Sequence, residues 1–223
     1  MEQLNALVIV DYIHRRWDVH AMAGARARAM AVPELSGGRN PEVGFWNRDI
    51  APAPSVVADG GGQLGRLEAH FLYCDTRPLT AGIVPAFEAA LQRPYGATHL
   101  LWWLAWAREL GCDVPAAITL ERIADEVVAD FAEARAVVDD TAVVNDLTIE
   151  QRALLAAAGL ADRLPPDWPA RVVSAQLPDG SWYEHVPNGS PEFSWHPTML
   201  AVWYLLAIGD PDRPDPGFLA GRP

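Results

Sequence analysis

Apolar residues recur at intervals of three and four along most of the chain, a spacing that brings them onto one face of an α-helix. No stretch alternates between apolar and polar residues for long enough to predict a β-sheet. The pattern therefore predicts an all-α protein with about nine helices. We expect a single domain over residues 1–223, with helices at 4–17, 19–31, 63–75, 78–91, 97–110, 116–137, 140–160, 166–176 and 196–208.

The helical pattern fails between residues 33 and 62, where proline and glycine surround only a few apolar residues. A loop of this length in a compact domain is usually functional or disordered. One interpretation is a lid held down by Phe45 and Trp46, and the other is a surface loop without a role.

The predicted helices differ in character. Residues 100–110 and 196–208 are apolar almost all round, which is typical of helices buried on most sides, whereas 121–135 has one heavily charged face. Alternating inner and outer helices joined by short turns predict a curved or closed double layer.

Two of the buried helices share a histidine and a tryptophan at the same spacing. His99 precedes Trp106 by seven residues, and His196 precedes Trp203 by seven residues. Seven residues span about two helical turns, so each pair lies on one stripe of its helix. A weaker third copy of this histidine–tryptophan pattern starts at His70, where Arg77 stands in place of the tryptophan.

A turn between the last two predicted helices has an unusual composition, Gln-Leu-Pro-Asp-Gly-Ser-Trp at residues 176–182. Pro178 and Gly180 supply turn geometry, the Gln176 amide can bond exposed helix ends, and the Trp182 indole can cover the next helix end. This stretch is similar to the Q-x-x-x-G-x-W repeat of the triterpene cyclase and prenyltransferase superfamily, and the resemblance implies an α/α toroid, here a partial or small barrel.

A second stretch, Val-Asp-Asp-Thr-Ala at residues 138–142, resembles the tail of the D-x-D-D-T-A motif of class II cyclases in that superfamily. Asp139 stands at the place of the family's general acid, whereas Val137 replaces the first aspartate. The simpler alternative is that Asp139 and Asp140 cap a helix at the positive end of its dipole.

The toroid implies parallel inner helices, whose N-terminal ends would meet at one mouth of a central cavity. The candidate catalytic residues at that mouth are His70, His99, His196, Asp139, Asp140 and Asp146. The candidate substrate-cavity residues are Tyr73, Trp102, Trp103, Trp106, Trp203 and Tyr204. Because indole faces stabilise cations, the arrangement suits acid-initiated cyclisation or isomerisation of a small apolar, isoprenoid or polyketide-like substrate.

Several alternatives stay open for these residues. The histidines and an aspartate could bind zinc or iron, although we expect no cofactor, or a histidine could act as a general acid or base without metal. A helix-start histidine is also often a cap, and tryptophans at helical spacing are most often core residues. A noncatalytic binding or partner protein, forming a homodimer through its exposed apolar faces, is the other functional class.

The amino-acid composition limits the classes of partner and the cellular compartments that we expect for this chain. The chain of 223 residues has a formal net charge of −12 and no lysine, which disfavours nucleic acid. No apolar run is long enough to cross a membrane, and the N-terminus lacks signal-peptide features. With only Cys74 and Cys112, we expect no disulfide framework and a reducing cytoplasm, and by analogy a role in bacterial specialised metabolism.

Overall fold

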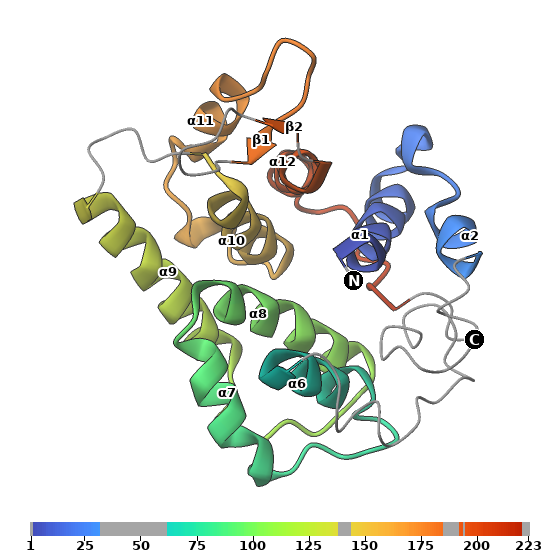
Figure 1. Cartoon of the computed structure of the whole chain (residues 1–223), viewed down its shortest axis with the longest axis vertical. Coiled ribbons are helices and arrows are strands. Elements are labelled where there is room, and N and C mark those ends of the chain that lie inside the picture. The colour runs from blue at the N-terminus through green and yellow to red at the C-terminus, as the bar shows by residue number, and fades with distance from the viewer. Residues whose placement is uncertain (1, 32–61, 138–143, 185–191, 194, 220–223) are drawn as a thin grey trace. The chain divides into compact units, whose positions relative to one another are not determined.

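The computed structural model describes residues 2–31, 62–137, 144–184, 192–193 and 195–219, and the regular secondary structure of this part of the chain is almost entirely helical (Figure 1). The predicted all-α class is confirmed. Strand structure in the described residues is limited to β1 (Tyr183–Glu184), which pairs antiparallel with β2 (Glu192–Phe193). The chain divides into two compact units, which are described separately: unit 1 (Met1–Leu120 with Pro214–Pro223) and unit 2 (Glu121–Arg213).

Unit 1 is built around a tryptophan-rich helix, α8, which packs against α6 and α7 (Figure 1). Leu100, Trp106 and Ala107 of α8 have no exposed surface, as its all-round apolar sequence predicts. The elements of unit 1 are α1 (Glu2–Trp17), η1 (His20–Met22), α2 (Ala25–Met30), α6 (Gly62–Leu72), η2 (Ala81–Ile83), α7 (Val84–Leu91) and α8 (Pro94–Glu109).

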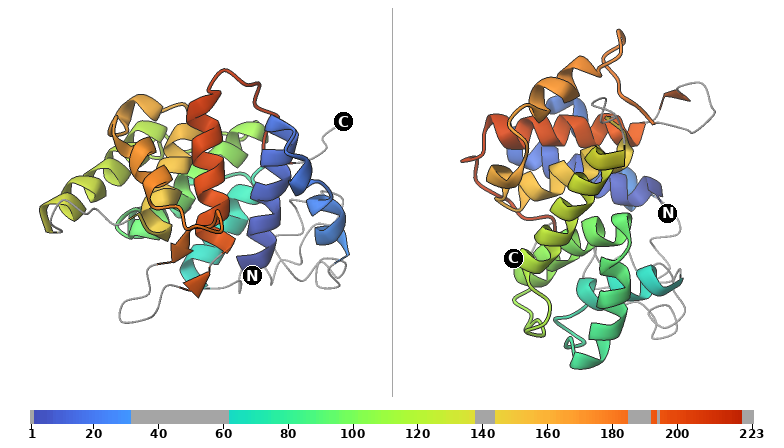
Figure 2. Two further views of the ribbon diagram at one scale, coloured as in Figure 1. Left: turned by 90° about the horizontal axis from the view of Figure 1, so that it is seen from above. Right: turned by 90° about the vertical axis from the view of Figure 1, so that its left-hand side faces the viewer.

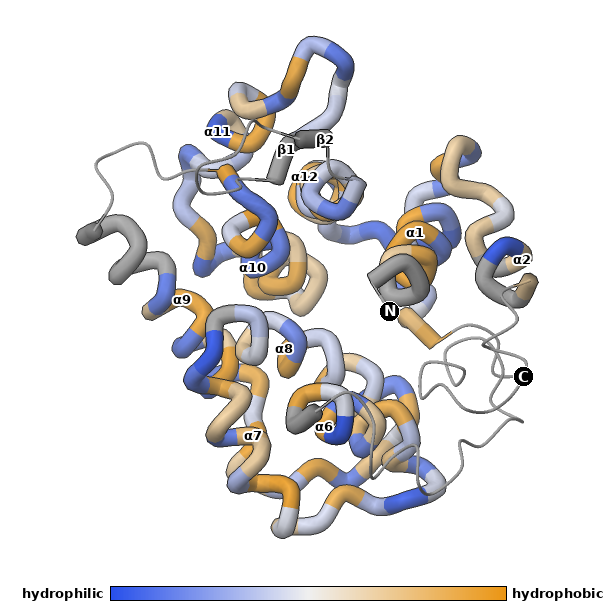
Figure 3. The backbone as a smooth tube through the Cα atoms, in the orientation of Figure 1, coloured by the Kyte–Doolittle hydropathy of each residue, from blue (hydrophilic) through white to orange (hydrophobic). Residues whose placement is uncertain are grey.

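Unit 2 is built around α12, which packs most extensively against α10, and the two helices lie side by side (Figure 2). Met199, Leu200, Trp203 and Tyr204 of α12 are buried. In the coloured first part of α9, up to Asp130, hydrophilic and hydrophobic positions both occur along the tube, as expected of a helix with one covered face (Figure 3). The elements are α9 (Leu120–Val137), α10 (Asp146–Ala157), η3 (Ala161–Arg163), α11 (Trp168–Ser174), β1, β2 and α12 (Trp195–Gly209).

Several helices begin later than the apolar pattern predicts. Thr80 is extended and precedes a 3-10 turn, so α7 begins at Val84 and places Pro85, instead of Pro78, in its first turn. Gly24 has a φ of +80°, and this left-handed conformation interrupts the helix predicted over 19–31. The segment at 33–62 lies outside the described residues, except that Gly62 begins α6.

The C-terminal segment is held in unit 1 by two charged side chains. The Arg15 guanidinium donates to the carbonyl oxygen of Phe218, while the Glu109 carboxylate accepts hydrogen bonds from the backbone N–H groups of Phe218 and Leu219 at 2.7 and 2.9 Å. Burial raises the pKa of Glu109. The Phe218 ring also stacks on Tyr12, with 4.2 Å between ring centroids, so both polar and aromatic contacts fix this segment.

Cys74 and Cys112 form a disulfide across a sequence separation of 38 residues. The expectation of a chain without a disulfide framework is therefore wrong. The bond joins the segment after α6 to the segment after α8. No local sequence pattern predicts a disulfide between two cysteines that are so far apart in the chain. Disulfides are typical of oxidising compartments, so this bond does not favour a cytoplasmic location. The cytoplasmic location stays a prediction.

Among the described helices, none combines the length and the apolar character that a membrane crossing requires.

Candidate functional site

The first carboxylate of the candidate site is positioned by the start of α10. Asn145 is extended and its side chain accepts a hydrogen bond from the Thr148 N–H at 2.9 Å, while the Thr148 hydroxyl accepts from the Asn145 N–H at 2.9 Å. This reciprocal cap makes Asp146 the first helical residue. The positive end of the helix dipole therefore favours the negative charge of the Asp146 carboxylate.

The start of α12 is positioned by the turn at residues 176–182. Gly180 has a φ of +87°, and the Gln176 amide donates to the Gly180 carbonyl at 2.8 Å, which closes the turn on itself. The buried Trp182 indole donates to the carbonyl of Val172 in α11 at 2.7 Å. The indole thus bonds the end of the preceding helix, and that it also covers the start of the next helix stays a prediction.

The connection to α12 is made by Thr198 instead. The Trp182 N–H donates to the Thr198 hydroxyl at 3.0 Å, and that hydroxyl lies 3.2 Å from the Trp182 carbonyl, to which it donates. These bonds join the turn to the first turn of α12. His196 lies in the same helical turn and is held at the N-terminal end of α12.

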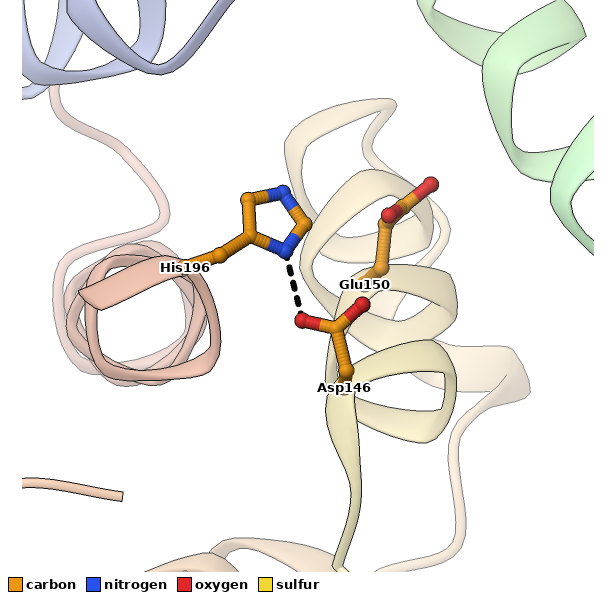
Figure 4. A group of neighbouring side chains, drawn as sticks. All are labelled: Asp146, Glu150 and His196. Atoms are coloured by element: carbon orange, nitrogen blue, oxygen red, sulfur yellow. Dashed lines mark hydrogen bonds and ion pairs between the residues drawn. The ribbon is translucent and has the colours of Figure 1, made fainter. Parts of the chain in front are cut away.

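These two helix starts bring three side chains together at one end of the α10–α12 pair (Figure 4). His196 Nδ1 lies 2.5 Å from Asp146 Oδ1, and the ligand atoms of His196, Asp146 and Glu150 all lie within 4.8 Å of one another. Glu150 follows Asp146 by four residues and shares its face of α10, because four residues are about one helical turn. Asp146 and Glu150 are buried, whereas 32% of the His196 side chain is exposed.

An exposed indole lies beside the imidazole. Trp195 is 37% exposed, and its ring meets the His196 ring edge to face with 5.4 Å between centroids. An exposed aromatic side chain next to an accessible imidazole offers an apolar surface at the place where a ligand would meet His196.

Buried groups of both charges lie around the cluster. Asp146, Glu150 and Arg152 are all buried, and the Arg152 guanidinium lies 3.5 Å from the Trp168 ring centroid. Further along α12, burial raises the pKa of Tyr204 to about 12, and the positive charge of Arg152 opposes that rise.

The geometry gives the two nitrogens of the His196 ring different tasks. A carboxylate that accepts from Nδ1–H fixes the tautomer and the orientation of the imidazole, and it stabilises the ring when the ring is protonated. The proton exchanged with a ligand is then carried by Nε2. The alternative use of the same atoms is coordination of a metal ion, for which two carboxylate oxygens and one imidazole nitrogen are suitable ligands.

No protein-family model, curated protein or solved structure matches the chain.

The other histidines predicted for the site belong to unit 1. His99 lies in α8, with its ring 5.6 Å from that of Trp103. His70 lies in the last turn of α6, which ends at Leu72, so the expectation that it lies at the N-terminal end of a helix was wrong. Burial, with a smaller effect of Arg77, lowers the pKa of His70. Asp139 and Asp140 lie outside the described residues.

The aromatic residues predicted to line the substrate cavity are buried side chains in their respective units. Trp102 packs edge to face against Trp106 at 4.8 Å between ring centroids, and Trp103 lies near Phe71 at 6.2 Å. All six are at most 5% exposed: Tyr73, Trp102, Trp103, Trp106, Trp203 and Tyr204. A described cavity in unit 1 is lined by none of them.

Sequence reasoning missed two members of the unit 2 cluster, Glu150 and Trp195. Glu150 could have been found from its four-residue spacing to Asp146, because that spacing places two carboxylates on one face of a helix. Trp195 directly precedes His196, but the sequence carries no signal that its indole stays exposed beside the imidazole.

Proposed function

We propose that this protein is an enzyme that moves a proton to or from a small, largely apolar substrate, with His196 as the general acid or base and Asp146 as its positioning residue. The observation that carries the proposal is the 2.5 Å contact between His196 Nδ1 and the buried Asp146 carboxylate. A histidine oriented in this way is suited to proton transfer near neutral pH.

An imidazolium is a weak acid, which limits the reactions that His196 could catalyse. An imidazolium is a much weaker acid than the one needed to protonate an isolated alkene. General acid catalysis is efficient only when the strength of the acid suits the group that it protonates. We therefore favour isomerisation or cyclisation of a substrate whose double bond is activated by a carbonyl group. The exposed Trp195 indole supports an apolar substrate, of isoprenoid or polyketide-like type.

The toroid arrangement is part of the same proposal. It is supported by the resemblance of the turn at 176–182 to the cyclase repeat, and by the meeting of the starts of α10 and α12 at Asp146 and His196. In a toroid, this end of the helix pair would open into a cavity where the substrate meets the imidazole.

Deuterium incorporation from D2O tests the reaction without knowledge of the natural substrate. We expect the protein to accelerate deuterium uptake into 3-cyclohexen-1-one or citral, whose carbonyl groups activate a double bond, but not into the simple alkene myrcene. Mass spectrometry of the recovered probes measures the uptake, and heat-denatured protein gives the background. Uptake into both carbonyl probes at the background rate would contradict the proposal.

A metal-dependent enzyme is the second candidate, because the ligand atoms of Asp146, Glu150 and His196 lie within 4.8 Å of one another. Three ligands from two packed helices leave open positions for water or substrate, which is typical of catalytic metal sites. Carboxylate oxygens and an imidazole nitrogen are suitable ligands for a divalent cation such as Zn²⁺ or Mn²⁺.

Glu150→Gln separates the two candidates, because Glu150 is needed as a metal ligand but not for the His196–Asp146 bond. If the site takes a cation, Glu150→Gln should weaken Zn²⁺ or Mn²⁺ binding by at least about tenfold, measured by isothermal titration calorimetry. Glu121→Gln changes an exposed glutamate of α9 and is the matched control. Equal binding by the two variants, or no binding by the wild-type protein, rules out this metal site.

A further inference from the structure

Unit 1 holds the segment Asp-Pro-Gly-Phe-Leu, residues 215–219, in the way that a protein holds a bound peptide. The chain reaches this segment through residues 210–216, which are all exposed and lie outside helices and strands. Phe218 and Leu219, by contrast, are only 6% and 8% exposed. A short buried anchor therefore follows an exposed connection.

Two charged side chains of unit 1 bind the backbone of the segment. Each carboxylate oxygen of Glu109 accepts one hydrogen bond, from the N–H groups of Phe218 and Leu219. The Arg15 guanidinium donates to the carbonyl oxygens of Pro216 and Phe218 at 3.4 and 3.2 Å. Unit 1 thus offers an acceptor for the N–H groups and a donor for the carbonyl groups of a peptide backbone.

The Phe218 side chain is held by two aromatic rings from different helices. Its ring stacks on Tyr12 of α1 and meets Trp102 of α8 edge to face, with 5.8 Å between the centroids of Phe218 and Trp102. Buried aromatic anchors of this kind dominate the binding energy of many protein interfaces. We call the four side chains that hold the segment, Tyr12, Arg15, Trp102 and Glu109, the segment site.

The turn before Phe218 fits the segment site only with glycine at position 217. Gly217 has a φ of +72°, and its N–H donates to the Asp215 carboxylate at 2.9 Å. A Cβ atom at this position would lie 2.8 Å from Glu109 Oε2, which is closer than normal van der Waals contact. A side chain at position 217 would therefore separate the segment from Glu109.

The occupant that suits the segment site best is the same segment from a second copy of the chain. A second copy carries the same five residues and would make the same hydrogen bonds and ring contacts. The segment leaves its own site without unfolding a helix or strand, because residues 210–219 belong to neither. Exchange of an identical element between copies is a low-cost route to a dimer.

We propose that unit 1 binds residues 215–219 as a separable peptide, and that two copies of the chain form a dimer by exchanging this segment. The proposal is independent of the function proposed for His196, because it uses residues of the other unit.

A fluorescein-labelled peptide with the sequence of residues 210–219 tests whether the segment is separable. Gly217→Val should keep the segment of the full-length chain out of its own site, because valine rarely adopts a positive φ and its Cβ would meet Glu109. We expect fluorescence anisotropy to show that this variant binds the peptide. The wild type should bind it more weakly, because its tethered segment competes at a high effective concentration.

A second substitution shows whether the peptide occupies the segment site. Glu109→Lys, added to Gly217→Val, should weaken peptide binding by at least about tenfold, because an ammonium group offers no acceptor to the two N–H groups. Asp113→Asn, at an exposed aspartate of unit 1, is the matched control and should leave binding unchanged. A peptide with valine in place of its glycine should not bind, and this control does not depend on the folding of a second variant.

No binding by Gly217→Val, or equal binding by Gly217→Val and the wild type, would overturn the proposal. Equal effects of the two added substitutions, or equal binding of the glycine and valine peptides, would also overturn it. Phe218→Ala, which removes the aromatic anchor, replaces Gly217→Val if that variant fails to fold.

Mixed full-length chains test the exchange itself. Glu109→Lys keeps its segment but lacks the acceptor, whereas Gly217→Val keeps the segment site but has a segment that does not fit. Each variant alone should be a monomer in size-exclusion chromatography with light scattering, and an equimolar mixture should contain a dimer. A mixture that stays monomeric at concentrations where the peptide binds, or one that dimerises no more than each variant alone, would contradict the exchange.

Discussion

An Asp146→Asn variant is expected to catalyse proton transfer about 10²- to 10⁴-fold more slowly than the wild-type protein. The asparagine amide keeps the size of the carboxylate but removes its negative charge, so it no longer stabilises a protonated His196. It can also present an N–H group to Nδ1, which favours the wrong tautomer of the ring. The rate of deuterium uptake from D2O into 3-cyclohexen-1-one or citral, measured from pH 5 to pH 9, checks this expectation.

Circular dichroism distinguishes a positioning role from a loss of structure. Removal of the carboxylate should slow proton transfer while the helical signal and the thermal midpoint stay close to those of the wild type, whereas a general loss of folded protein would lower all three. Asp125→Asn, at an exposed aspartate of α9 paired with Arg163, is the matched control and should keep the wild-type rate.

His196→Gln should remove the proton carrier itself. Residues that act as one unit have non-additive effects, so the variant carrying both His196→Gln and Asp146→Asn should be no slower than His196→Gln alone. A wild-type rate in Asp146→Asn, or a double variant slowed by the product of the two single effects, would show that the pair does not act together.

Removal of the disulfide is expected to lower the free energy of unfolding by about 4 kcal/mol, the value that loop-closure entropy predicts for the 38-residue separation of Cys74 and Cys112. Cys112→Ser is the better variant, because Cys112 is only half-buried and the serine leaves little empty space, whereas Cys74 is 3% exposed. Denaturation by urea, followed by circular dichroism, measures the change.

Dithiothreitol provides the control within the same experiment. The reductant should lower the stability of the wild-type protein to that of Cys112→Ser, and it should leave the variant unchanged because the variant has no disulfide to reduce. A wild-type protein whose unfolding is insensitive to the reductant under conditions where both thiols become free would contradict a stabilising role. The result also bears on location, because a cytosolic protein would have to fold without this bond.

The helical class and the buried character of α8 and α12 follow from local sequence. Leu100, Trp106 and Leu200 fall at helical spacing within runs that are apolar on every side, and such helices are stable only when surrounded by other side chains. Helix starts were less predictable. Thr80 and Asn145 are extended residues whose backbone conformation and hydrogen bonds, more than hydrophobic spacing, decide where α7 and α10 begin.

The sequence predicted two residues of the candidate site, but it did not predict that these two lie together. Asp146 and His196 stood among the sequence candidates, but so did His70 and His99, which lie in unit 1. Fifty residues separate Asp146 from His196, and no local rule relates positions so far apart. The contact between Asp146 and His196 depends on how α10 packs against α12, and that packing exists only in the folded chain.

Local sequence is enough to predict that helices form, which faces they bury and the turn at 176–182, because each depends on neighbours within a few residues along the chain. Which distant groups meet depends on the fold: Asp146 with His196, Cys74 with Cys112, and α6 with the start of α7. The physical reason is that burial and packing act between residues that are close in space, and the hydrophobic pattern contains their tendency to be buried but not their partners.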